Sequence, residues 1–157
     1  ASVLAASEAV VLHFAGDLDA AVAVLRDTLG RDPTFGLAHF FLGAALRDAG
    51  ALDAAEAAYR DAIVLASRSP EMLCGLGVVL ARRGDERGAR ALLGELRAAA
   101  SSRYVAPTLF AQLYAALGDL DAADVALGDA RALHDPELGF LGVRPSYRAL
   151  HGRPAFE

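Results

Sequence analysis

Two identical hexapeptides in this sequence carry closely spaced aspartates, the residue type that general acid–base catalysis uses in pairs. GDLDAA occurs at residues 16–21 and again at 118–123. Paired carboxylates can serve as acid and base when their surroundings separate their pKa values. Each pair, however, stands where a run with helical apolar spacing begins, and the positive end of a helix dipole favours carboxylates there. The residues interpreted in this way as structural are Asp17, Asp19, Asp119 and Asp121.

The other residue types with catalytic potential form no recognisable motif. The sequence has no GxSxG nucleophile motif, and its four histidines form no HxxxH or HExxH pair. A single cysteine, Cys74, excludes an intrachain disulfide and a CxxC metal site. The glycines of Gly75-Leu76-Gly77 lie inside a helical pattern and lack the strand that precedes a phosphate-binding loop. We predict that the protein is not an enzyme and has no catalytic residue, no cofactor and no metal site.

The hexapeptide belongs to a period of 34 residues that runs through the chain. Looser copies, GALDAA at 50–55 and GDERGA at 84–89, fill the two steps between the identical ones. Small residues stand seven positions before and five positions after the first glycine of each copy, and large apolar residues stand four before and nine after it. A fixed period of this length indicates an array of structural repeats. The anchoring glycines are Gly16, Gly50, Gly84 and Gly118.

Each period has the features of two antiparallel helices joined by a tight turn. Apolar residues recur at three and four positions on both sides of the glycine. Glycine suits the left-handed conformation that ends the first helix. The aspartate after it (Asp17, Asp85 or Asp119) can cap the second helix by accepting a hydrogen bond from a free backbone N–H. The small residues on both sides of the turn allow the two helices to approach closely.

This pattern resembles the tetratricopeptide repeat, whose signature is W-x2-L-G-x2-Y, then A-x3-F, then P. Residues 36–69 carry it best, with His39, Leu42, Gly43, Leu46, Ala55 and Tyr59 at signature positions. The resemblance implies an all-α fold, a right-handed α-solenoid of four helix-turn-helix repeats. We expect a single domain over residues 1–157, with repeats at about 2–35, 36–69, 70–103 and 104–137 and an irregular C-terminal capping segment at 138–157.

The fourth repeat and the C-terminal segment depart from the period. SSRYVAP, at 101–107, cannot all be helical because the residue before a proline is pushed out of the helical conformation. The apolar residues that we expect to cover the last repeat, as a solenoid end requires, are Leu138, Phe140, Leu141, Tyr147, Leu150 and Phe156. YVAP, LGDLDAA and the final segment also resemble the end of tetratricopeptide arrays in bacterial winged-helix regulators, adenylate cyclases and protein kinases. That resemblance implies a sensory or scaffolding module, and we expect the sequence to be part of a longer bacterial protein.

Charge and hydropathy limit the expected partners. A net charge of −5 argues against nucleic-acid binding, which requires a basic face. The longest apolar run, at 35–46, is too short to span a bilayer. The N-terminus lacks the basic region of a signal peptide. We expect a cytoplasmic protein with neither a nucleic-acid partner nor a membrane partner.

The leading hypothesis is a non-catalytic interaction module that binds a protein or peptide. In arrays of this family the first helices of the repeats line a concave groove. The predicted groove residues are His13, Phe14, Leu37, Phe40, Arg47, Asp48, Glu71, Val78, Arg82 and Gln112. An apolar wall of Leu37, Phe40 and Val78, edged by Arg47 and Arg82, suits an amphipathic helix or an extended peptide with an acidic group. The chain has no Lys and no Asn, so the carboxylate clamp of chaperone-binding family members is not expected.

Three alternatives remain open. Residues 104–137 have a net charge of −5 and residues 70–103 a net charge of +2, so an acidic end and a basic middle can guide self-association into a homodimer. The concave face can instead sense a small ligand, which would require a closed pocket with convergent polar groups. Finally, a neighbouring helix or the rest of the protein can cover the apolar wall.

Overall fold

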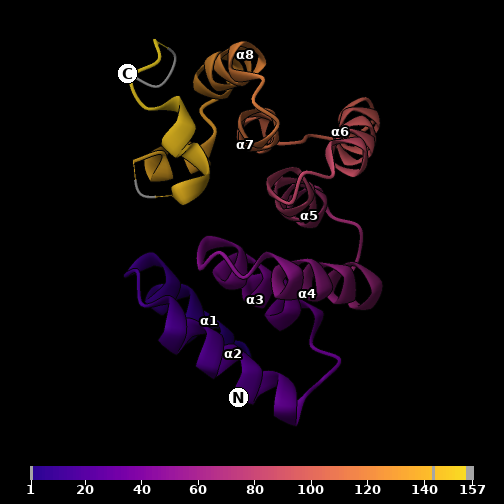
Figure 1. Cartoon of the computed structure of the whole chain (residues 1–157), viewed down its shortest axis with the longest axis vertical. Coiled ribbons are helices and arrows are strands. Elements are labelled where there is room, and N and C mark those ends of the chain that lie inside the picture. Colours follow the sequence, from indigo (N-terminus) through magenta and orange to yellow (C-terminus); the bar gives the residue numbers. More distant parts are fainter. Residues whose placement is uncertain (1, 143, 155–157) are drawn as a thin grey trace.

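The structure, a computed structural model, describes residues 2–142 and 144–154, and within these residues it contains helices and no strands. Eight α-helices follow one another in this part of the chain, and consecutive helices pack together (Figure 1). They are α1 (Ser2–Phe14), α2 (Leu18–Arg31), α3 (Gly36–Asp48), α4 (Leu52–Leu65), α5 (Pro70–Arg82), α6 (Glu86–Ala100), α7 (Pro107–Ala116) and α8 (Leu120–Ala132). Two short 3₁₀ helices follow, η1 (Pro136–Phe140) and η2 (Pro145–Leu150). The predicted all-α fold of helix-turn-helix repeats is confirmed.

The four helix pairs curve around a common interior. Figure 1 shows the chain passing from α1 and α2 through α3 to α6 and on to α7 and α8. The C-terminal segment, in yellow, then returns toward α1 on the open side of the curve. The interior of the array is therefore bounded by the first repeat, the later repeats and the C-terminal segment.

The turns within the helix pairs have the predicted conformation. The four anchoring glycines have φ angles between +78° and +85°, the left-handed region in which glycine has no Cβ penalty. Asp17, Asp85 and Asp119 each accept a hydrogen bond from the backbone N–H three residues further on. The second repeat has Ala51 at this position and therefore has no side-chain cap. The closely spaced aspartates of the two identical hexapeptides therefore lie at the starts of helices and serve the helix ends.

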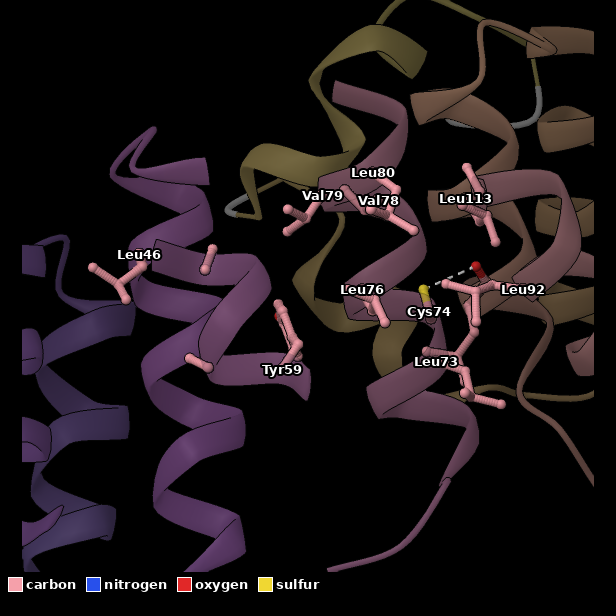
Figure 2. Close-up of a cluster of buried hydrophobic side chains, with 14 of the residues drawn as sticks. Leu46, Tyr59, Leu73, Cys74, Leu76, Val78, Val79, Leu80, Leu92 and Leu113 are labelled. Atoms are coloured by element: carbon pink, nitrogen blue, oxygen red, sulfur yellow. Dashed lines mark hydrogen bonds between the residues drawn. The ribbon is translucent and has the colours of Figure 1, made fainter. Parts of the chain in front are cut away.

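The two helices of each repeat approach closely because small residues occupy the predicted contact positions. Ala9, Ala21, Ala55, Ala89, Ala111 and Ala123 are all buried. Tyr59 on α4 contacts two further small residues, Gly43 on α3 and Gly75 on α5, and a Cβ at either position would overlap its ring. Figure 2 shows Tyr59 between its own repeat and α5, beside the buried side chains of α5.

The fourth repeat is irregular where the sequence predicts it. Residues 101–106 are not helical, and α7 has 10 residues whereas α3 and α5 have 13. In the C-terminal segment Leu141, Tyr147 and Leu150 are buried in a cluster with residues of α7 and α8. Phe140 departs from the prediction because it contacts the first repeat, and Phe156 lies outside the described residues.

The contact between Tyr59 and Gly75 generates a stability prediction. Gly75→Ala should lower the free energy of unfolding by about 1–3 kcal/mol, because the added methyl group overpacks the tyrosine ring. Gly94→Ala is the matched control, since Gly94 is exposed on α6 with open space around it. The control should raise the free energy of unfolding by about 0.5–1 kcal/mol through its lower unfolded-state entropy. Urea unfolding of both variants measures the difference, and equal stabilities would contradict the proposed packing.

Candidate binding site

The largest hollow that we describe lies inside the curve of the array. It has a volume of about 650 Å³ and is lined by side chains of α1, α3, α5, α7 and the C-terminal segment. Most of its wall is apolar or aromatic, with Phe14, Phe40, Phe41, Tyr104 and Leu109 among the lining residues. A cavity of this size and composition is typical of a binding site for a small molecule or a few side chains.

The C-terminal segment closes one side of this cavity. Phe140 of η1 stacks on Phe14 at the end of α1, with 5.2 Å between the ring centroids. The guanidinium carbon of Arg144 lies 5.4 Å from the centre of the Phe14 ring and 5.5 Å from that of Phe140. Arg144 also pairs with Glu137 at 3.0 Å. Two aromatic rings and one arginine thus connect the first repeat to the last part of the chain.

A buried polar chain joins the first repeat to the second at the cavity wall. His13 Nε2 and Asp48 Oδ2 are 2.8 Å apart, in a hydrogen bond between α1 and α3. Arg47 Nε donates to Asp48 Oδ1 at 2.9 Å, and Arg47 Nη1 donates to the Tyr59 hydroxyl at 3.4 Å. The side chains of Arg47 and Asp48 are about 5% and 4% exposed, so this ion pair has little contact with solvent.

The polar chain stabilises the charged forms of its members. Burial alone would raise the pKa of Asp48, but the hydrogen bond from His13 and the charge of Arg47 outweigh it and hold that pKa well below its usual range. Burial alone would lower the pKa of Arg47, but Tyr59 and Asp48 outweigh it and raise that pKa. Both residues are therefore charged at neutral pH and bound to each other.

Further polar groups at the cavity join α7 to the residues that follow α8. Asp135 Oδ2 accepts hydrogen bonds from the hydroxyl and the backbone N–H of Thr108, at 2.7 and 3.2 Å. Gln112 Nε2 donates to the hydroxyl of Tyr147 at 2.9 Å. Glu71 and Arg148 also line the cavity, and neither forms an ion pair with another residue in the described part of the chain. An incoming ligand would therefore find these two charges available.

Cys74 lies in the cavity wall but does not have the properties of a nucleophile. Its thiol is buried and donates to the backbone oxygen of Leu109 at 3.3 Å. Burial raises its pKa to about 12, so the thiol stays protonated at neutral pH. Among the described residues no group of three or more His, Cys, Asp or Glu side chains could hold a metal ion.

The structure brings most of the predicted groove residues to the cavity. Those that line it are His13, Phe14, Phe40, Arg47, Asp48, Glu71 and Gln112. Leu37 is exposed but does not line the cavity, and Val78 is 1% exposed within the core, so the predicted apolar wall of Leu37, Phe40 and Val78 is wrong. Val78 packs among the buried residues of the core cluster instead of lining an open groove.

The predicted arginine edge also changes. Arg47 is buried in its ion pair with Asp48 and is not a free edge charge. Arg82 is exposed and donates to the backbone oxygen of Arg47 at 3.4 Å, beside the cavity. Burial and the charge of Arg47, with a smaller contribution from Arg148, lower the pKa of Arg82. The exposed cations at this edge are therefore Arg82 and Arg148.

The repeat pattern in the sequence does not predict several of the residues that line the cavity. Tyr59 is predicted only as a signature position of the repeat, and Tyr104, Arg144 and Arg148 lie in the two segments where the repeat pattern fails. A periodic pattern cannot place such residues. The one sequence signal was the concentration of aromatic and arginine residues among the last residues of the chain.

Comparison with known families agrees with the helical architecture. The family model described as tetratricopeptide repeat matches residues 2–27 and 71–95. The first stretch covers α1 and most of α2, which form the first helix pair. The second stretch covers most of α5 and α6, which form the third helix pair. No curated protein matches the sequence. In the described part of the chain, the helices all fall short of the length and apolar character that crossing a membrane requires.

The buried ion pair generates a stability and pH prediction. Asp48→Asn should destabilise the fold by about 3–5 kcal/mol, because it leaves Arg47 buried without its counter-charge. The folded-state pKa of Asp48 lies below its unfolded value, so its contribution to stability is present above about pH 4 and is lost as the pH falls below that value. Urea unfolding across this pH range should therefore show a flatter acid dependence for the variant than for the wild type.

A matched control is Asp27→Asn, because Asp27 forms an exposed ion pair with Arg31. It should change the free energy of unfolding by about 0.5 kcal/mol or less. The double variant Arg47→Met with Asp48→Leu should recover stability relative to Asp48→Asn, since it removes both buried charges. If the single and double variants unfold alike, an uncompensated Arg47 is not the cause of the loss.

Proposed function

We propose that this chain is a tetratricopeptide-repeat protein and a non-catalytic interaction module that binds a short segment of a partner protein in its concave cavity. Repeats of this family generally mediate protein–protein interactions, and the family is typically a non-enzymatic scaffold. The observation that carries the proposal is the cavity itself, which has an apolar wall and charged residues at its edge. This combination suits a peptide anchored by an apolar side chain.

The size of the cavity favours a short segment over a long helix. A helix about 10 Å in diameter with a pitch of 5.4 Å fills roughly 420 Å³ per turn. The volume of about 650 Å³ therefore corresponds to about one and a half helical turns. Arg144, Pro145 and Arg148 of the C-terminal segment line the cavity and bound it on one side. We infer that one or two large apolar side chains of the partner enter the cavity.

The charges at the edge favour an acidic group beside that apolar anchor. Arg148 and Arg82 are both exposed and lie close enough for their charges to interact. A carboxylate of the partner would relieve this repulsion and form an exposed ion pair. Glu71, which carries a negative charge, also lines the cavity and would favour a hydrogen-bond donor or a positive group elsewhere on the same segment. The proposed ligand is thus a short peptide with an aromatic or aliphatic residue next to an acidic one.

We place this module in the cytoplasm, without a nucleic-acid or membrane partner. The net charge of −5 disfavours nucleic acid. The buried, unpaired thiol of Cys74 is compatible with a reducing compartment.

The enclosure of the cavity favours sensing of a small ligand as a second candidate function. Convergent polar groups, including Arg144, Gln112 and Asp135, line a space that the C-terminal segment partly closes. Its volume lies within the range of about 300–1,000 Å³ that small-molecule sites occupy. A screen of metabolites by thermal shift tests this candidate beside the peptide experiment.

Filling the cavity tests the proposed function. Peptides selected from a random display library on the wild-type protein should lose more than about thirtyfold in affinity for Ala44→Phe, because the new ring occupies the site of the apolar anchor. Ala54→Phe is the matched control, since Ala54 is exposed on α4 and lies outside the cavity. Isothermal titration calorimetry measures both affinities, and circular dichroism verifies that both variants fold.

Charge reversal tests the acidic part of the ligand. Arg148→Glu should weaken binding of the selected peptides about fivefold, the effect of losing about 1 kcal/mol from an exposed ion pair. Arg26→Glu makes the same change in net charge on α2 and should leave the affinity unchanged. Selected peptides that bind Ala44→Phe as tightly as wild type would refute the concave site. Metabolites that raise the melting temperature of wild type but not of Ala44→Phe, with no peptide selected, would instead support the ligand sensor.

A further inference from the structure

A second hollow lies between α6, α7 and α8, on a different surface from the concave cavity. It has a volume of about 600 Å³, and none of its lining residues also lines the concave cavity. Phe110 and Tyr114 of α7 lie between a wall formed by α8 and Arg97 of α6. We call this hollow the outer groove.

The outer groove exists because the fourth repeat does not follow the period. Four residues connect α2 to α3 and α4 to α5, whereas six residues, 101–106, connect α6 to α7. The longer connection and the shorter α7 leave α7 packed on α5 and α8 but only lightly on α6. In Figure 1 the connection between α6 and α7 is correspondingly extended. As a result Phe110 and Tyr114, which would pack on α6 in a regular array, are only partly covered.

The wall formed by α8 carries an apolar stripe of its own. Ala122, Val125 and Leu133 form this stripe, and Asp129 lies between Val125 and Leu133 on the same face; all four residues line the outer groove. Val125 and Leu133 are 67% and 60% exposed. Large apolar side chains exposed along one helix face indicate a surface that another protein covers. Helix α8 therefore forms one wall of the outer groove and also carries an apolar stripe of the kind that could fill such a groove.

We propose that the outer groove is a self-association surface, in which α8 of a second copy of this chain lies antiparallel to α8 and fills the groove. A two-fold arrangement is self-complementary, because each chain contributes one stripe and one groove. This surface is independent of the proposed peptide site, so either can fail without the other.

The charges on the two walls select a second copy over an unrelated helix. Arg97 on α6 donates to the Tyr114 hydroxyl at 2.6 Å, and Asp129 lies on the opposite wall. Neither Arg97 nor Asp129 has an ion-pair partner among the described residues. Antiparallel α8 helices direct Asp129 of each chain toward Arg97 of the other and form two equivalent ion pairs. The opposite net charges of residues 104–137 and 70–103 favour the same arrangement.

Sedimentation equilibrium at low and high salt tests this surface. The wild type should form dimers whose dissociation constant rises with salt, because the pairs at the edge of the interface are screened. Asp129→Arg and Arg97→Asp should each raise the dissociation constant at least tenfold, roughly the effect of replacing attraction by repulsion. The charge-swapped double variant should return to within about threefold of the wild type, because the ion pairs re-form with reversed sign.

Two further variants complete the experiment. Val125→Glu should abolish dimerisation by placing a charge in the apolar stripe. Glu8→Arg, at an exposed position of α1, makes the same change in net charge as Asp129→Arg and should not affect dimerisation. A wild type that is monomeric at every concentration overturns the proposal, and the groove would then fit an amphipathic helix of another protein. The proposal is also overturned if Asp129→Arg and Arg97→Asp both dimerise as tightly as the wild type. It is overturned equally if each single variant weakens dimerisation and the double variant does not restore it.

Discussion

The ring of Tyr59 lies against two glycines, Gly43 of α3 and Gly75 of α5, so closely that neither position has room for a methyl group. This contact determines how near the second and third repeats approach each other. The hydroxyl of the same residue accepts a hydrogen bond from Arg47, and Arg47 holds Asp48, which reaches His13 on α1. One tyrosine therefore couples the apolar packing between repeats to the polar chain that joins the first repeat to the second. That polar chain forms part of the wall of the concave cavity, so the packing of the core and the shape of the cavity depend on the same side chain.

The parts of the fold that local chemistry determines could be predicted from the sequence. A glycine with positive φ and an aspartate that accepts from a backbone N–H are adjacent in the chain, so their types and spacing suffice to place the turns. The enclosure of the concave side could not be predicted in this way. It depends on the stacking of Phe140 on Phe14, and these residues meet only because small rotations between repeats add up to a curve that brings the two ends together. The sequence pattern of one repeat does not show the total curvature that several repeats produce together.

The residues of the candidate site also fall into two groups, those that repeat geometry predicts and those that it does not. Repeat geometry places His13, Phe40 and Gln112 on the inner face, and they line the cavity. It does not indicate how charges pair. Arg47 was expected at an edge but is buried, because Asp48 and Tyr59 supply partners that make burial of its charge tolerable. The exposed cation Arg148 comes from the C-terminal segment, where no period exists to predict its position.

The irregular segment at 101–106 contributes to both surfaces that we propose. Tyr104 and Ala106 line the concave cavity, whereas the same segment separates α6 from α7 and so opens the outer groove. The short helix that follows has a face on each side, with Leu109 at the cavity and Phe110 at the groove. In a strictly periodic array each surface would repeat along the solenoid, and none would be distinct. A single break in the period, placed next to one short helix, gives this chain two different surfaces that share a structural element.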